Sequence, residues 1–91
     1  MVGIAFYTPE TYARLLREAD DRDGLHENYS DWLRDFKKME KKLKKEGFAV
    51  TPVPVNLDQL RLWCLLRQLP NNGASRSRWV QEEGPKFSGL L

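Results

Sequence analysis

Apolar residues recur at alternating steps of three and four positions over residues 29–43, which is the pattern of a helix with one buried face. At about 100° per residue these positions fall within an arc of roughly 80°. Gly47 can end the helix in a left-handed conformation, which places Phe48 against the last apolar position. The pattern therefore predicts a long helix with the apolar residues Tyr29, Trp32, Phe36, Met39 and Leu43.

Two short apolar segments on either side of this helix have the composition of β-strands. They are "VGIAFY" at residues 2–7 and "FAVTPVPV" at residues 48–55. Because Pro52 and Pro54 share parity in the second strand, both missing N–H groups lie on the same edge. We therefore expect this strand to pair only through its other edge, which is formed by Ala49, Thr51, Val53 and Val55.

A shorter helix is predicted from Pro9 to about Arg22, because Thr8 can cap it and proline suits the first helical position. Together with the longer helix it would form an up-down pair between the two strands. Such a pair brings the chain back to the same end of the sheet at which the first strand ended. The two strands are therefore expected to be antiparallel.

Residues 56–69 predict a third helix, capped by Asn56, that is apolar on two sides. One arc holds Leu57, Leu60, Trp63 and Cys64, and the other holds Leu62, Leu65, Leu66 and Leu69. A domain of 91 residues buries only about 60–65% of its unfolded surface, so it has little material to cover both arcs. Either this helix is the central element of the monomer, or its second arc meets another subunit. We predict the second, a homodimer formed through that arc or through the open edge of the first strand. Trp79 then either anchors the contact between subunits or closes the core over this helix.

The turn "PNNG" at residues 70–73 precedes a short helix over residues 76–83, for which Ser75 can serve as the cap. Gly84 and Pro85 are expected to stop this helix, which leaves residues 85–91 as a flexible tail. The predicted fold is a single α+β domain over residues 1–84. Its order is β-α-α-β-α-α, with a two-stranded antiparallel sheet packed on three main helices and a short fourth helix.

Charge is distributed unevenly along the chain, although the net charge is only +2. Residues 1–33 carry three basic and seven acidic groups, residues 34–46 carry seven basic and three acidic groups, and residues 47–91 carry five basic and three acidic groups.

The longest apolar runs are too short to span a membrane, and the N-terminus lacks the pattern of a secretory signal. A single cysteine, Cys64, suits a reducing compartment, so a cytoplasmic location is expected.

The basic groups of residues 34–46 form a stripe opposite the apolar arc of the long helix. We call Arg34, Lys38, Lys41, Lys42 and Lys45 the basic stripe. Such a stripe is typical of a solvated helix face, and it could also track a phosphate backbone. No aromatic residue interleaves with it, so the partner for base stacking is missing. Nucleic-acid binding through the basic stripe with Ser75, Arg76 and Arg78 is therefore the alternative prediction.

The segment Val50 to Glu83 resembles the ribbon-helix-helix regulators, in the order strand "VTPVPV", helix "LDQLRLWCLLRQL", turn "PNNG" and "SRSRWVQEE". The resemblance implies that the strand enters the major groove and that Ser75 with Arg76 holds phosphate. The two prolines of the strand depart from that family, since they stand where strand pairing is needed.

The whole chain, through "YTPETYARLL", "VPVNLDQLRLWC" and "NGASRSRWV", resembles a family of small bacterial proteins with no established activity. That second resemblance implies a bacterial, cytoplasmic origin.

The sequence contains no complete motif of a catalytic or metal-binding site. "ADDRDG" at residues 19–24 lacks the first and last ligands of a calcium loop, and "GASRS" lacks the spacing and the lysine of a phosphate-binding loop. His26 and Cys64 supply two unrelated ligands where zinc needs three or four. We therefore expect no cofactor and no enzymatic activity, and we predict an interaction protein; a deep pocket joining His26 and Cys64 would favour an enzyme instead.

Overall fold

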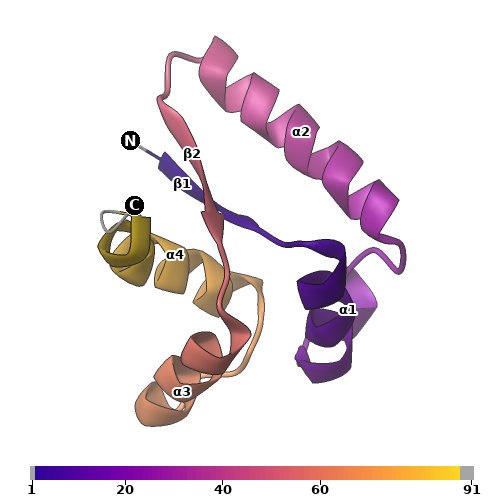
Figure 1. The fold of residues 1–91 in the computed structure, drawn as a ribbon, viewed down its shortest axis with the longest axis vertical. Helices are drawn as coiled ribbons and strands as arrows, with labels where there is room; N and C mark the ends of the chain where they lie inside the picture. The colour runs from indigo at the N-terminus through magenta and orange to yellow at the C-terminus, as the bar shows by residue number, and fades with distance from the viewer. Residues whose placement is uncertain (1, 89–91) are drawn as a thin grey trace.

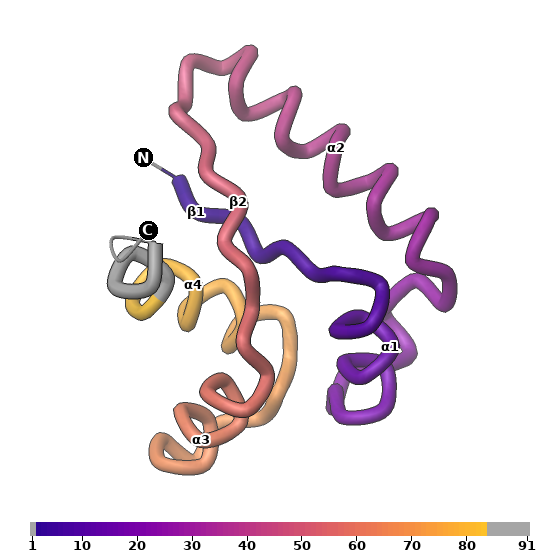
Figure 2. The backbone as a smooth tube through the Cα atoms, in the orientation of Figure 1, coloured from indigo at the N-terminus to yellow at the C-terminus, as the bar shows by residue number. Residues whose placement is uncertain are grey.

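The computed structural model describes the backbone of residues 2–88 and the side chains of residues 2–83. Two strands and four helices follow one another along the chain, with a 3₁₀ turn after the first helix (Figures 1 and 2). The elements are β1 (Val2–Phe6), α1 (Pro9–Glu18), η1 (Arg22–Gly24), α2 (Tyr29–Lys45), β2 (Val50–Pro54), α3 (Leu57–Arg67) and α4 (Gly73–Ser88).

Local capping sets several of these boundaries as the sequence predicts. The Thr8 hydroxyl accepts a hydrogen bond from the Thr11 backbone N–H at 3.1 Å at the start of α1, and Asn56 caps α3 in the same way. Gly47 ends α2 with a φ of 94°, and the Phe48 N–H donates to the Leu43 carbonyl at 3.0 Å. The predicted end of α1 near Arg22 is wrong, because the helix stops at Glu18 and the acidic segment that follows turns through η1.

The two strands form a parallel pair, so the predicted antiparallel sheet is wrong. Val2 lies opposite Val50, and Phe6 lies opposite Pro54. The helices between the strands differ in length, with 10 residues in α1 and 17 in α2. At ~1.5 Å per residue α2 spans about 25 Å, and it alone carries the chain back past the whole of β1. As Figure 1 shows, β2 therefore starts beside the start of β1.

The predicted pairing edge of β2 is the edge that β1 occupies. The Val2 N–H donates to the Ala49 carbonyl at 2.8 Å, and the Val55 N–H donates to the Phe6 carbonyl at 3.1 Å. The nitrogens of Pro52 and Pro54 therefore face away from β1, where no further strand can pair with them. Because β1 occupies one edge of β2 and the prolines block the other, β2 has no further edge for the strand pairing that the ribbon-helix-helix resemblance needs.

The strand pair lies between α2 on one side and α4 on the other (Figure 1). Phe6 faces α2, where its ring centroid lies 5.3 Å from that of Phe36. Gly3 has the opposite parity and faces α4 so closely that a Cβ atom there would lie 3.2 Å from Val80 Cγ1. The core continues from this layer to α1 and α3, and its most buried large side chains are Trp79, Tyr12, Leu15, Leu60 and Val80.

The last helix is a fourth main helix of 16 residues rather than a short one. Asn72 is its cap, since its side-chain oxygen accepts from the Ser75 N–H at 3.0 Å, so the predicted cap at Ser75 is wrong. The backbone of α4 also continues through Gly84 and Pro85, because a proline removes one helical hydrogen bond and not all of them. The predicted flexible tail overlaps α4 up to Ser88, and its remainder lies outside the described residues.

Candidate functional site

Three leucines of α3 form the largest group of exposed apolar side chains in the described part of the chain. Leu62, Leu65 and Leu66 are 57%, 65% and 73% exposed, and we call them the leucine face. The other arc of the same helix is buried in the core, as the sequence predicts, and consists of Leu57, Leu60, Trp63 and Cys64. Leu69, which was predicted to belong to the leucine face, is half-buried against the core. The domain therefore covers one apolar arc of α3 and leaves the other exposed.

Trp79 is buried beneath the leucine face and is not part of the exposed surface. Its side chain is 1% exposed, although one of its two predicted roles was to anchor the contact between subunits. A shallow hollow of about 260 Å³ lies between Leu62, Leu66 and the buried rings of Trp63 and Trp79. The Arg67 guanidinium lies 4.4 Å from the centroid of the Trp63 ring, which is a cation–π distance. The surface around the leucine face thus rests on packed aromatic rings.

The basic stripe lies on the exposed side of α2. All five of its residues are exposed, and Arg34 forms an ion pair with Asp31 at 3.0 Å. The aromatic residues of α2 point the other way, toward β1 and α1, where Trp32 lies 5.3 Å from Tyr7 between ring centroids. The structure therefore places the basic stripe on a helix face without stacking groups.

Arg76 and Ser75, predicted as phosphate ligands beside the basic stripe, lie in the first turn of α4 with their side chains buried. The Arg76 guanidinium donates to both carboxylate oxygens of Asp21, at 3.0 and 2.8 Å, and also to the carbonyl and side-chain oxygens of Asn71. Arg78 is exposed, pairs with Glu82 at 3.3 Å and lies over the Trp63 ring. The structure does not bring these residues into one surface with the basic stripe, so nucleic-acid binding stays a prediction that rests on α2.

Tyr7 lies beside this buried ion pair, and burial raises its pKa to about 12, partly offset by the positive charge of Arg76. An unfolded chain would ionise this phenol near pH 10, below its pKa in the folded protein. We therefore expect the free energy of unfolding to fall as pH rises from about 10 to about 12. Urea unfolding across that range, followed with tyrosinate absorbance, checks this, and the Tyr7→Phe variant should lose part of the pH dependence.

His26 and Cys64 have different partners, so the structure does not join them in one site. His26 Nε2 lies 2.5 Å from an Asp35 carboxylate oxygen, whereas the Cys64 thiol is buried near the Pro70 carbonyl and burial raises its pKa. A cavity of about 400 Å³ beside Cys64 is lined by Glu18, Asp20, Arg61, Leu65, Leu69 and Asn71, and His26 is not among them. Within residues 2–83 no three side chains of the metal-binding types gather in a cluster.

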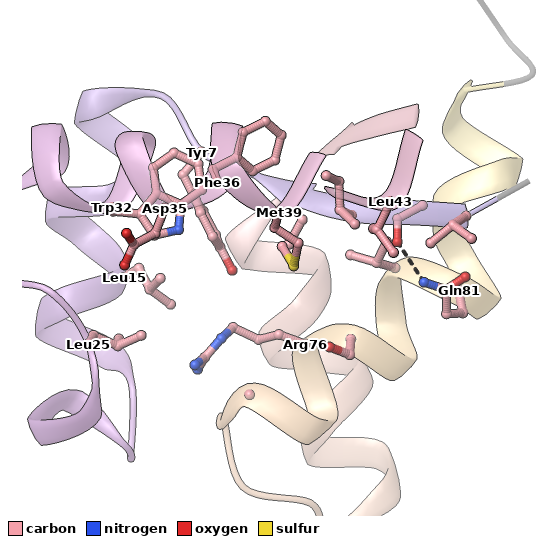
Figure 3. A pocket seen from close by; sticks show the side chains of 17 residues that line it. Tyr7, Leu15, Leu25, Trp32, Asp35, Phe36, Met39, Leu43, Arg76 and Gln81 are labelled. Atoms are coloured by element: carbon pink, nitrogen blue, oxygen red, sulfur yellow. Dashed lines mark hydrogen bonds between the residues drawn. The ribbon is translucent and has the colours of Figure 1, made fainter. Parts of the chain in front are cut away.

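A larger cavity that the sequence analysis did not predict runs along β1. Its volume is about 530 Å³, and it opens between β1, α2 and α4 (Figure 3). The composition of residues 2–7 can predict a strand, but a cavity beside the edge of that strand depends on the placement of two distant helices.

Across the described helices, none combines the length and apolarity needed to cross a bilayer. Comparison of the chain with protein-family models, with curated proteins and with solved structures gives no match.

Proposed function

We propose that the protein is a non-enzymatic interaction protein that acts as a homodimer, with the leucine face of α3 at the contact between two copies. The exposure of Leu62, Leu65 and Leu66 is the observation that carries this proposal. Side chains of this type gain about 1.5–3 kcal/mol each when they are fully buried. At the observed exposures, burial of the leucine faces of both copies would gain about 6–12 kcal/mol. The cost of association must be subtracted from this gain, whereas a micromolar complex has a net binding free energy of about 8 kcal/mol. We therefore expect a dimer of micromolar or weaker affinity.

A second copy fits this face because the face is short. The helix has 11 residues and spans about 16 Å, and the three leucines occupy its C-terminal half. A two-fold axis beside Leu65 would place each leucine face against its equivalent, which is the self-complementary arrangement of most homodimers.

Sedimentation equilibrium of the unmodified chain tests this proposal over about 5–500 μM, a range that brackets the expected affinity. The apparent mass should rise with concentration toward twice the 10.7 kDa of the chain. A constant mass of 10.7 kDa over the whole range would show that the leucine face does not bind a second copy.

The bacterial origin and the cytoplasmic location expected from the sequence remain part of this proposal. What supports a reducing compartment is that Cys64 is the only cysteine of the chain and that its thiol is buried.

A further inference from the structure

The outer edge of β1 presents backbone groups that β2 does not use. Since the Val2 N–H and the Phe6 carbonyl face β2, residues of odd number in β1 face the other way. Two carbonyls on this side are occupied: Gln81 Nε2 donates to the Gly3 carbonyl at 2.6 Å, and the Tyr29 hydroxyl donates to the carbonyl of Tyr7, one residue past β1, at 2.7 Å. Among the described residues, no such contact is made by the Gly3 N–H, the Ala5 N–H or the Ala5 carbonyl. Groups of this kind are costly when they face apolar surroundings without a partner.

These groups line the floor of the cavity between α2 and α4, which we call the edge groove. Residues from Val2 to Ala5, and then Tyr7, line it, so it follows nearly the whole length of the strand. One wall is the apolar row of α2, formed by Phe36, Met39 and Leu43, and the other wall belongs to α4 (Figure 3). The α4 wall offers Ser77 and Gln81, which are polar, and the paired guanidinium of Arg76.

We infer that the edge groove binds an extended segment of a partner protein, which adds a third strand to the sheet at β1. The unpaired N–H and C=O groups of β1 are complementary to those of an extended backbone. Successive side chains of a strand point to opposite faces, and here one face meets an apolar wall and the other a polar wall. The preferred segment therefore has apolar residues at every second position and small or polar residues between them.

The walls of the groove argue against β1 of a second copy as the occupant. In each copy β1 already lies between α2 and α4, and both helices also line the groove beside its free edge. Two such edges would have to approach to about 4.8 Å to pair, and the four helices would then compete for the same space. A segment without helices packed on its faces meets no such obstacle.

The test uses a fluorescein-labelled peptide of seven alternating valine and threonine residues with a lysine at each end. We expect saturable binding by fluorescence anisotropy with a Kd of about 10–100 μM, as for a short peptide held by backbone hydrogen bonds and a few side chains. A control peptide of the same composition, with the valines in one block and the threonines in another, should bind at least tenfold more weakly, because only the alternating order suits both walls.

Two variants of the protein test the position of the site. Ala5→Pro removes one outward N–H and leaves the hydrogen bonds to β2 in place, so it should weaken binding of the alternating peptide at least tenfold. Met39→Glu places a charge on the apolar wall at a side chain that is 46% exposed, and it should weaken binding to a similar extent without affecting the core. Leu65→Glu, on the leucine face, should leave peptide binding unchanged.

The inference is wrong if the peptide does not saturate below about 1 mM, or if the alternating and block peptides bind equally. It is also wrong if Ala5→Pro by itself lowers the mass of a self-associated species, since the edge would then belong to a second copy. Circular dichroism establishes that each variant is folded. If Ala5→Pro does not fold, equal binding by Met39→Glu and the unmodified chain overturns the inference on its own. Because the Leu65→Glu control separates the two surfaces, failure of the dimer and failure of this site are distinguishable.

Discussion

Leu65→Glu is expected to convert the protein into a folded monomer. In the single chain this side chain is 65% exposed, so a carboxylate there remains in water and the free energy of unfolding changes little. In the proposed dimer the same position lies beside the two-fold axis, where two carboxylates would be desolvated next to each other. An unpaired charge in an apolar contact costs several kcal/mol, so the dissociation constant should rise more than about 100-fold. Sedimentation equilibrium should then give the mass of one chain, 10.7 kDa, at every concentration.

Met39→Glu is the matched control, because it makes the same chemical change at another partly exposed apolar side chain. Met39 lies on α2 in the wall of the edge groove, away from the leucine face. This variant should retain the concentration-dependent mass of the unmodified chain. If Leu65→Glu associates as strongly as the unmodified chain, α3 is not the contact between copies. Equal loss of association in both variants would point to a general effect of added negative charge.

Asp21→Ala is expected to destabilise the fold more than Arg76→Met, although the two residues form the same ion pair. The two side chains are unequally buried, with Arg76 6% exposed and Asp21 35% exposed. Removal of Asp21 leaves a guanidinium charge buried without an anion, which costs about 3–5 kcal/mol. Removal of Arg76 leaves a carboxylate that water still reaches, and methionine keeps much of the apolar packing, so we expect about 1–3 kcal/mol. Urea unfolding of both variants and of the double variant measures the difference.

The double variant and the pH dependence provide the controls for this prediction. Asp21→Ala combined with Arg76→Met should cost less than the sum of the single changes, because no charge is then left unpaired. Hydrogen bonds from Arg76 hold the pKa of Asp21 below its ordinary value. The ion pair therefore contributes stability above about pH 4, and this contribution is lost as pH falls through the lower pKa of the folded state. Equal destabilisation by the two single variants would contradict the proposed asymmetry.

Most helices and both strands follow from short-range patterns that the sequence carries by itself. The apolar spacing from Tyr29 to Leu43 and the glycine at position 47 suffice for α2, because helical periodicity and a left-handed cap are local properties. The two prolines of β2 likewise determine which edge of that strand can pair. Asn72 shows the limit of such local signals: several residues in "PNNGAS" can cap a helix, and only the backbone geometry selects one.

The exposed leucines were also predictable from the sequence as one arc of a helix that is apolar on two sides. Whether the domain would cover both arcs or only the first was not predictable from periodicity alone, since both arcs consist of apolar residues. The tertiary structure covers only the first arc, since Leu60 and Trp63 belong to the same buried cluster as Trp79 of α4. Trp79 was ambiguous for the same reason, because a tryptophan suits an interface and a core equally well by composition, and the structure buries it in the core.

The amino-acid sequence by itself determined the order of the elements, their amphipathic faces and the blocked edge of β2, because each depends on residues a few positions apart. Only the tertiary structure decided the parallel direction of the strands, the burial of Arg76 against Asp21 and the edge groove beside β1. These features join residues about 50 or more positions apart, as the Asp21–Arg76 and Gly3–Gln81 hydrogen bonds show. Their formation depends on how far and in which direction each helix carries the chain, which no local periodicity encodes.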